Sequence, residues 1–137
     1  MDSRCYFAIK ACQNNYEVVI CKKSNFFVNA KTYEPGIVML KSAGVRNFKG
    51  ITEIKSAGHS ISVMDEEGLM YFSAEDFVKR RIHKESLKYI DYIFTWGHDD
   101  YQFISNYLSE NKEKVYKTGS PRIDILKEPI NQIYYDN

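Results

Sequence analysis

Short apolar runs alternate along this chain with segments of helical periodicity, and this alternation limits the possible folds more than any other feature. Runs of four to six residues rich in β-branched and aromatic side chains are typical of buried strands. Strands are therefore predicted over residues 17–21, 37–40, 60–64, 92–96 and 115–118. Strands that alternate with helices through short connections favour a parallel sheet. The sequence predicts a three-layer, Rossmann-like α/β fold with helices on both faces of the sheet.

The helices are expected in the intervening segments, over residues 2–14, 24–32, 45–57, 74–82, 84–89 and 99–110. Asn15 and Gly58 are predicted to end the first and third helices, and Ser24 to cap the second. Ser73 and Asp76 have the spacing of a capping box. Because the chain opens on a helix, whereas a wound α/β sheet ordinarily begins on a strand, we expect the first strand to be missing. An unpaired interior position would then favour marginal stability or self-association.

Composition and charge exclude several classes of function. The 137 residues suit one domain, and a net charge of +1 lacks the basic footprint of a nucleic-acid binder. No apolar run approaches the roughly 20 residues that span a bilayer, so we expect no transmembrane segment and a location in the cytoplasm or at the inner face of the membrane. Cys5, Cys12 and Cys21 lack metal-site spacing and are expected to be buried hydrophobes. With no dinucleotide or Walker A loop and no metal motif, no cofactor and no metal are predicted.

A block of acidic residues directly follows one predicted strand. Asp65, Glu66 and Glu67 come after residues 60–64, and Gly68 then allows the backbone to turn. Parallel sheets bind ligands beyond the carboxyl ends of their strands, so this block is the candidate for catalytic acid or base chemistry, with Gly68 beside the substrate. A solvated acidic turn remains the alternative.

Two further strand ends carry candidate substrate-binding residues. Trp96, Gly97 and His98 follow residues 92–95, and Gly119 and Arg122 follow the last strand. Glycine permits sharp turns or close approach to a ligand. A guanidinium can bind phosphate or carboxylate, although Arg122 could equally anchor a neighbouring domain, and His98 is either a general acid or base or a surface residue.

A basic cluster, Lys79-Arg80-Arg81, ends the helix predicted over residues 74–82. Positive charge in a last turn complements the helix dipole. We interpret the cluster as dipole compensation and a solubilising surface rather than as an anion-binding site.

Three motifs together carry a resemblance to a known family. They are residues 58–69, 94–97 and 118–126, and in this order and spacing they resemble the N-terminal lobe of bacterial surface carbohydrate (surface polysaccharide) biosynthesis proteins, a GT-B-like glycosyltransferase group. The resemblance spans almost the whole chain, although Ser120 stands where that family usually has Asn. It implies that residues 1–126 form the N-terminal lobe and residues 127–137 a truncated interlobe linker.

The resemblance implies an enzyme of two Rossmann-like lobes. The N-terminal lobe receives a glycan or sugar acceptor, and the second lobe holds a nucleotide-sugar donor. A single lobe is expected to be inactive until a donor-lobe partner supplies the second half of the cleft. Asp65, Glu66 and Glu67 would then provide acid or base chemistry on the acceptor side.

Two other functions stay open. The first is a nucleotide-sugar epimerase of GT-B type, which would turn over a sugar nucleotide without an acceptor. The second is a non-catalytic, flavodoxin-like interaction module in which Asp65 is a receiver-type acid, although paired acids after a first strand are lacking.

Overall fold

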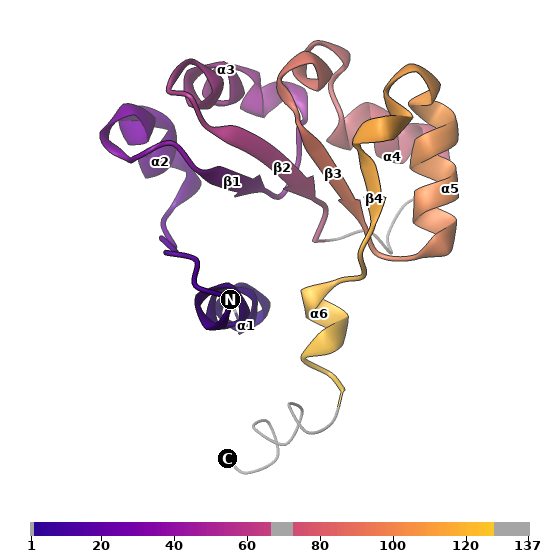
Figure 1. Cartoon of the computed structure of the whole chain (residues 1–137). Helices are drawn as coiled ribbons and strands as arrows, with labels where there is room; N and C mark the ends of the chain where they lie inside the picture. Colours follow the sequence, from indigo (N-terminus) through magenta and orange to yellow (C-terminus); the bar gives the residue numbers. More distant parts are fainter. Residues whose placement is uncertain (1, 67–72, 128–137) are drawn as a thin grey trace. The chain divides into compact units, whose positions relative to one another are not determined.

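The computed structural model describes residues 2–66 and 73–127, which belong to two compact units. The first unit combines residues 1–21 with residues 119–137, and the second is Lys22–Thr118. The second unit contains the sheet and most of the helices (Figure 1).

The sheet of the second unit has parallel strands in the order β1-β2-β3-β4. The strands are β1 (Ile37–Leu40), β2 (Ser60–Met64), β3 (Tyr92–Thr95) and β4 (Val115–Lys117). Val63 of β2 lies between Leu40 of β1 and Ile93 of β3, and Ile93 pairs onward with Val115. The predicted parallel α/β fold is therefore confirmed.

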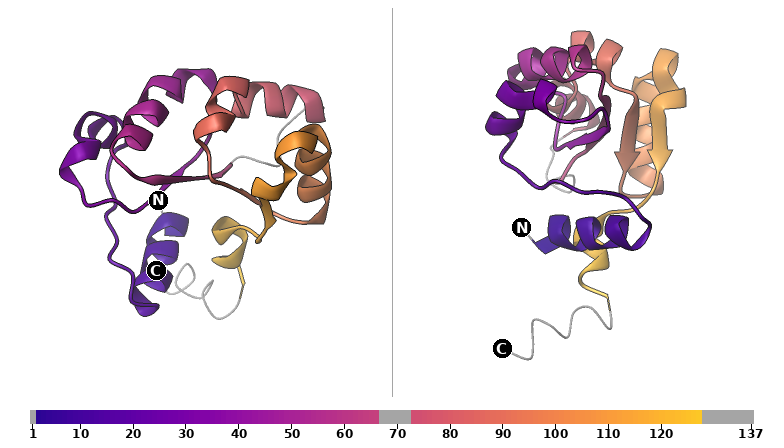
Figure 2. Two further views of the ribbon diagram at one scale, coloured as in Figure 1. Left: turned by 45° about the horizontal axis from the view of Figure 1, so that its top comes forward. Right: turned by 60° about the vertical axis from the view of Figure 1, so that its left-hand side comes forward.

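Helical segments connect each strand to its immediate neighbour. They are α3 (Phe48–Ser56), α4 (Ala74–Arg81) and α5 (His98–Tyr107) with the 3-10 segments η2 (Val45–Asn47), η3 (Lys84–Tyr89) and η4 (Ser109–Lys114), and α2 (Lys23–Asn29) with η1 (Ala30–Thr32) precedes β1. Successive right-handed crossovers in one direction place their helices on one face of a sheet. Figures 1 and 2 show this arrangement in the second unit. Helices on the second face stay a prediction.

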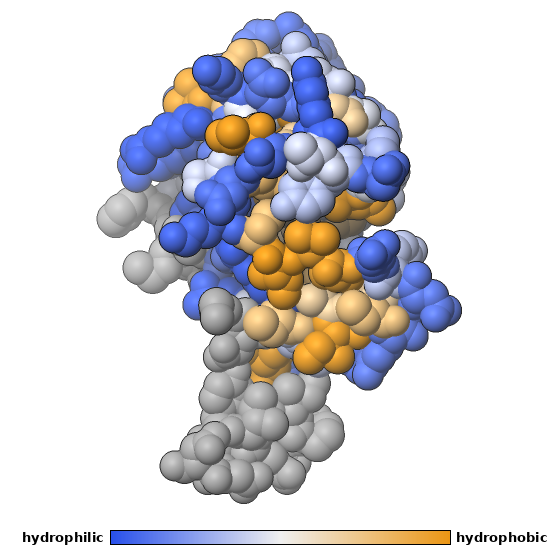
Figure 3. All heavy atoms as spheres, turned by 90° about the vertical axis from the view of Figure 1, so that its left-hand side faces the viewer, coloured by the Kyte–Doolittle hydropathy of each residue, from blue (hydrophilic) through white to orange (hydrophobic). Residues whose placement is uncertain are grey.

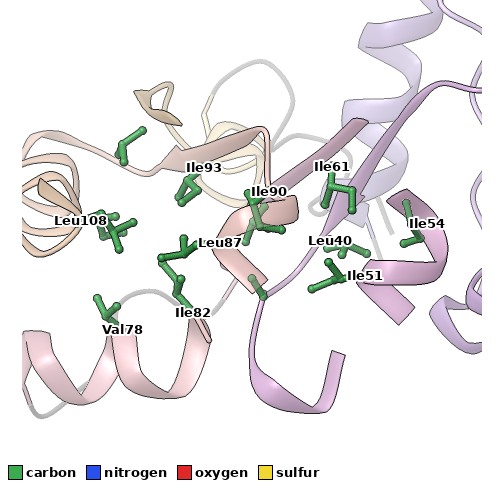
Figure 4. Packing of buried hydrophobic residues seen from close by; sticks show 14 of the residues in the cluster. Leu40, Ile51, Ile54, Ile61, Val78, Ile82, Leu87, Ile90, Ile93 and Leu108 are labelled. Atoms are coloured by element: carbon green, nitrogen blue, oxygen red, sulfur yellow. The ribbon is translucent and has the colours of Figure 1, made fainter. Parts of the chain in front are cut away.

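The hydrophobic core lies between that face of the sheet and the helices (Figure 4). The strands contribute Leu40, Ile61, Val63, Ile93 and Val115. The helical segments contribute Ile51, Ile54, Val78, Leu87 and Ile104. On the opposite face Ile37, Met39, Tyr92 and Tyr116 are exposed, whereas Ser62 and Met64 of β2 are buried on that face as well.

The strand predicted over residues 17–21 is wrong. This segment has no strand pairing, and Val19 and Ile20 are 61% and 57% exposed. Apolar residues also lie at the surface on the side of the molecule shown in Figure 3. A segment of high β-propensity forms a strand when it can pair with another strand and bury its side chains. Among the described residues this segment has no strand partner, and its side chains stay exposed. The described sheet consequently has four strands instead of five.

Two smaller expectations are also wrong. Cys12 and Cys21 are exposed and Cys5 is half-buried, because the helix and the extended segment that carry them bury little surface. Lys22, without a side-chain cap, precedes α2, so Ser24 lies inside the helix.

The first unit contains two helices that contact each other, α1 (Asp2–Gln13) and α6 (Pro121–Asp124). Asn15 follows α1 with φ of 64°, so the predicted stop is confirmed. Ser120 caps α6 by accepting a hydrogen bond from the Arg122 N–H. Within the described ranges, no helix combines the length and apolar character needed to cross a bilayer.

His59 has a structural role, as its position before β2 predicts. The Gly36 N–H donates to Nδ1 (3.1 Å), and Nε2 therefore carries the proton and lies 2.9 Å from the Ala30 carbonyl oxygen. The ring is 3% exposed. It joins η1 to the amino-terminal ends of β1 and β2.

The same amino-terminal edge contains an ion pair. Lys55 Nζ lies 2.8 and 2.7 Å from the two carboxylate oxygens of Asp91, and the Ile61 N–H donates to Oδ2 (2.8 Å). Burial raises the pKa of Asp91, but the hydrogen bonds from Lys55 and Ile61 outweigh it, so the pKa lies below its ordinary value.

A lowered pKa in the folded state makes the ionised Asp91 stabilising at neutral pH. We expect Asp91→Asn to lower the free energy of unfolding at pH 7, and the difference from the wild type to shrink as the pH falls below about 4, through the lowered pKa. Denaturant titrations at several pH values measure it. Glu85→Gln, which breaks a fully exposed pair with Lys88, is the control and should change little. A pH-independent loss in Asp91→Asn would contradict the assignment.

Gly50 lies where α2 and α3 pack closely. A Cβ added there would meet the Phe27 ring at 2.1 Å. We expect Gly50→Ala to destabilise the protein, since overpacking costs about 1–3 kcal/mol and alanine regains only about 1 kcal/mol of helix propensity. Thermal unfolding measures the change, and Glu53→Ala on the exposed side of α3 is the matched control. A more stable Gly50→Ala variant would show that Phe27 moves aside freely.

Candidate functional site

The carboxyl ends of the strands meet at one edge of the sheet, because all four strands are parallel (Figure 1). Lys41 and Ser42 follow β1, Asp65 follows β2, and Trp96 follows β3. The candidate site is built from these loops and from the end of α4.

Asp65 is held at this edge by Arg81, the last residue of α4. The Asp65 side chain is 11% exposed, and Arg81 Nε lies 3.7 Å from Asp65 Oδ1. The carbonyl oxygen of Arg81 also accepts a hydrogen bond from the Ala43 N–H (2.8 Å), in the loop after β1. A largely buried carboxylate is costly without a charged partner. Arg81 therefore fixes Asp65 and joins the end of α4 to the loops that follow two strands.

The position of Arg81 follows from how α4 begins and ends. Ser73 accepts a hydrogen bond from the Asp76 N–H (3.2 Å), so Ser73 is confirmed as the N-cap, and the return bond of the capping box from the Asp76 side chain stays a prediction. Ile82, just after the helix, forms a parallel bridge with Ala43. Gly44 then packs so tightly that an added Cβ would lie 2.8 Å from the Arg80 carbonyl oxygen.

Trp96 connects the ends of β2 and β3. Its indole N–H donates to the carbonyl oxygen of Asp65 (2.5 Å), and the side chain is half-buried. The Thr118 N–H donates in turn to the carbonyl oxygen of Thr95 (3.2 Å), which ties the end of β4 to β3. Trp96 is the only tryptophan in the sequence, so it is a built-in probe of this edge.

Ser42 belongs to a second polar cluster behind the site. The Asn47 amide donates to the carbonyl oxygen and the hydroxyl of Ser42 (2.8 and 3.1 Å), and Lys23 Nζ donates to Asn47 Oδ1 (2.7 Å). Asn47 is 7% exposed. These bonds fix the loop after β1, so the wall of the site is rigid.

A small hollow of about 20 Å³ lies between these groups. Its polar lining is Lys41, Ser42, Asp65 and Arg81, and core residues form its floor. This volume suits about one water molecule, whereas ligand pockets usually measure about 300–1,000 Å³. The hollow can hold a water against the carboxylate, and a larger ligand must lie outside it.

The structure brings some of the predicted site residues together and leaves others apart. It brings Asp65 and Trp96 together, with half-buried Glu66 next along the chain. His98 is exposed at the start of α5. Gly97 has extended backbone and an added Cβ would meet no protein atom, so the fold itself does not require glycine there. Glu67 and Gly68, the last two residues of the predicted acidic block, lie outside the described residues.

Gly119 and Arg122 belong to the first unit. Gly119 has φ of 94°, in the left-handed region that favours glycine, so the turn after β4 requires it. Arg122 is exposed in α6, and its function in binding stays a prediction.

Arg81 is the residue of the candidate site that sequence reasoning missed. The interpretation of the basic cluster as a solvated helix end holds for Lys79 and Arg80, whose pairs with Glu75 and Asp76 are exposed. It is wrong for Arg81, which lies three residues after the buried Val78 and hence on the same helix face. That spacing was the available signal.

Comparisons with known proteins leave the family of this chain open. No family model, no curated protein and no solved structure matches it. Across residues 2–66 and 73–127, no group of three or more His, Cys, Asp or Glu side chains is arranged to hold a metal ion.

We expect Arg81→Gln to cost about 3 kcal/mol of stability, because it removes a cation from beside the largely buried Asp65 carboxylate. Arg80→Gln, one residue earlier and exposed, should cost less than about 1 kcal/mol. Denaturant unfolding of both variants, with a double-mutant cycle of Arg81→Gln and Asp65→Asn, measures the coupling. Equal effects of the two arginine variants would show that Arg81 does not hold Asp65.

Proposed function

We propose that this chain is the acceptor-side lobe of a GT-B-like glycosyltransferase of bacterial surface polysaccharide biosynthesis. The observation that carries the proposal is the carboxylate of Asp65, fixed by Arg81 beside Trp96 at the carboxyl end of a parallel strand. Ligands of open α/β sheets bind beyond these strand ends. The resemblance of residues 58–69, 94–97 and 118–126 to that family supports the same function.

Glycosyl transfer needs a base near the acceptor hydroxyl and positive or dipolar groups on the leaving phosphate, held across one cleft. Asp65, with Glu66 and Glu67, supplies carboxylates on the acceptor side. The acceptor sugar lies over the mouth of the hollow, with the face of Trp96 as an apolar contact.

The donor half of the cleft comes from a second lobe. The described residues hold a single parallel sheet, and the nucleotide sugar binds only once a donor-lobe segment or partner chain closes over this edge. His98 then contacts the substrate, and Gly119 and Arg122 belong to the hinge that leads to the second lobe. The protein works in the cytoplasm or at the inner face of the membrane, where nucleotide sugars are made.

A non-catalytic, flavodoxin-like interaction module is the second candidate. The small volume of the hollow, about 20 Å³, is the observation that favours it, because a hollow of this size among the described residues is far smaller than a sugar-binding pocket. In this case Asp65 and Arg81 serve only to stiffen the edge.

Trp96 allows a direct test, because its indole N–H gives a single resonance and its ring is the single tryptophan fluorophore, both at the site. We expect oligosaccharides of bacterial surface polysaccharides to shift the indole N–H resonance and the tryptophan emission. Asp65→Asn should weaken this response at least tenfold, a loss of about 1.4 kcal/mol in binding free energy. Asp76→Asn, on the exposed side of α4, is the matched control and should respond like the wild type.

The acceptor proposal is overturned if no oligosaccharide changes either signal, or if Asp65→Asn, still folded, responds unchanged. A response to nucleotide sugars alone would instead indicate the epimerase-type function. Circular dichroism of each variant establishes that the comparison concerns folded protein.

A further inference from the structure

β1 is an end strand of the described sheet, and its own four residues carry none of the usual edge protection. It pairs with β2 on one side, and no described strand pairs with its other side. Its four residues, Ile-Val-Met-Leu, include no charge and no proline. Free strand edges pair readily with other strands, and proteins usually prevent this with charged side chains, prolines or bulges.

The opposite edge of the same sheet is protected. β4 is only three residues long and ends on the exposed Lys117, and Lys114 directly precedes it. Lysine is the residue most often used to keep an edge from pairing. β1 has Lys41 directly after it and Pro35 two residues before it, but no lysine within the strand itself, so β1 is the edge more open to a further strand.

The hydrogen-bond pattern shows which backbone groups β1 presents outward. The Ser60 N–H donates to the Gly36 carbonyl oxygen (2.9 Å), so Gly36, and Val38 two residues on, face β2. Backbone groups alternate in direction along a strand, and hence those of Ile37 and Met39 face away from the sheet. Their side chains lie on the face opposite the core and are 67% and 39% exposed.

We propose that β1 pairs in antiparallel fashion with β1 of a second copy of this chain. The twofold axis passes between the two Val38 residues, and Ile37 of each copy exchanges both backbone hydrogen bonds with Met39 of the other. This register follows from the alternation of backbone groups along β1. Two directly opposite residues can exchange both hydrogen bonds only if the N–H and C=O groups of both face outward, as those of Ile37 and Met39 do. Two four-stranded sheets thereby join into one continuous sheet.

The edge is complementary to itself, and this identifies a second copy as its partner. Ile37 and Met39 meet on the same face, so apolar side chains meet apolar side chains and no charge is buried. A twofold pairing of identical edges closes on itself and stops at the dimer. A net charge of +1 gives little repulsion between copies.

The interface is small because β1 has only four residues. Interfaces below about 1,200 Å² are typical of weak and transient association. The dimer therefore forms and dissociates with protein concentration, in keeping with the self-association expected of a sheet with an unpaired edge.

Sedimentation velocity of the wild type over a range of concentrations is the first measurement. We expect the mass to rise from that of a monomer toward twice that value. Ile37→Lys should remain monomeric wherever the wild type is dimeric, because it places a charge from each copy in the interface. Val45→Lys is the matched control, since Val45 is also 67% exposed but lies in η2, and it should dimerise like the wild type.

Ile37→Pro is a second variant, which removes one outward N–H without adding charge at the first residue of a strand, where proline is tolerated. It should weaken the dimer while circular dichroism shows retained structure. A wild type that is monomeric at every concentration overturns the proposal, as does a dimer that Ile37→Lys leaves intact. Open-ended assemblies larger than a dimer overturn it too, because the twofold pairing closes.

Discussion

Each connection in the second unit runs from a parallel strand to its immediate neighbour, and a right-handed crossover returns on the same side each time. The helices therefore gather over one face, where Ile51, Ile54 and Val78 meet the buried side of the strands. The same constraint brings every strand end to one edge. The hydrophobic core, the candidate site and the face of the sheet turned away from these helices all follow from this one order of strand pairing.

The ion pair between Asp65 and Arg81 shows how that edge is held together. Arg81 contributes its guanidinium to the loop after β2 and its carbonyl oxygen to the loop after β1. Trp96, just after β3, donates a hydrogen bond from its indole N–H to the backbone carbonyl oxygen of Asp65, in the loop after β2. The end of α4 and one indole thereby link three loops that would otherwise be independent.

The features predicted correctly are those that local sequence determines. The apolar runs at 37–40 and 60–64 both form strands, of which the second is buried almost throughout and the first only at Leu40. Ser73 caps its helix through a bond three residues away, and Gly58 adopts φ of 88° after α3. The failures depend on partners distant in sequence. Residues 17–21 have strand propensity but no strand beside them, and Arg81 acquires its function from Asp65, which is sixteen positions earlier.

The exposed β-branched segment around Val18 and Ile20 has a consequence for the lifetime of the protein in a cell. Chaperones and proteases act on extended apolar chain that is accessible, whether or not the rest of the molecule is folded. We therefore expect any partner that covers this segment to slow proteolysis of the chain even where the stability of the sheet is unchanged.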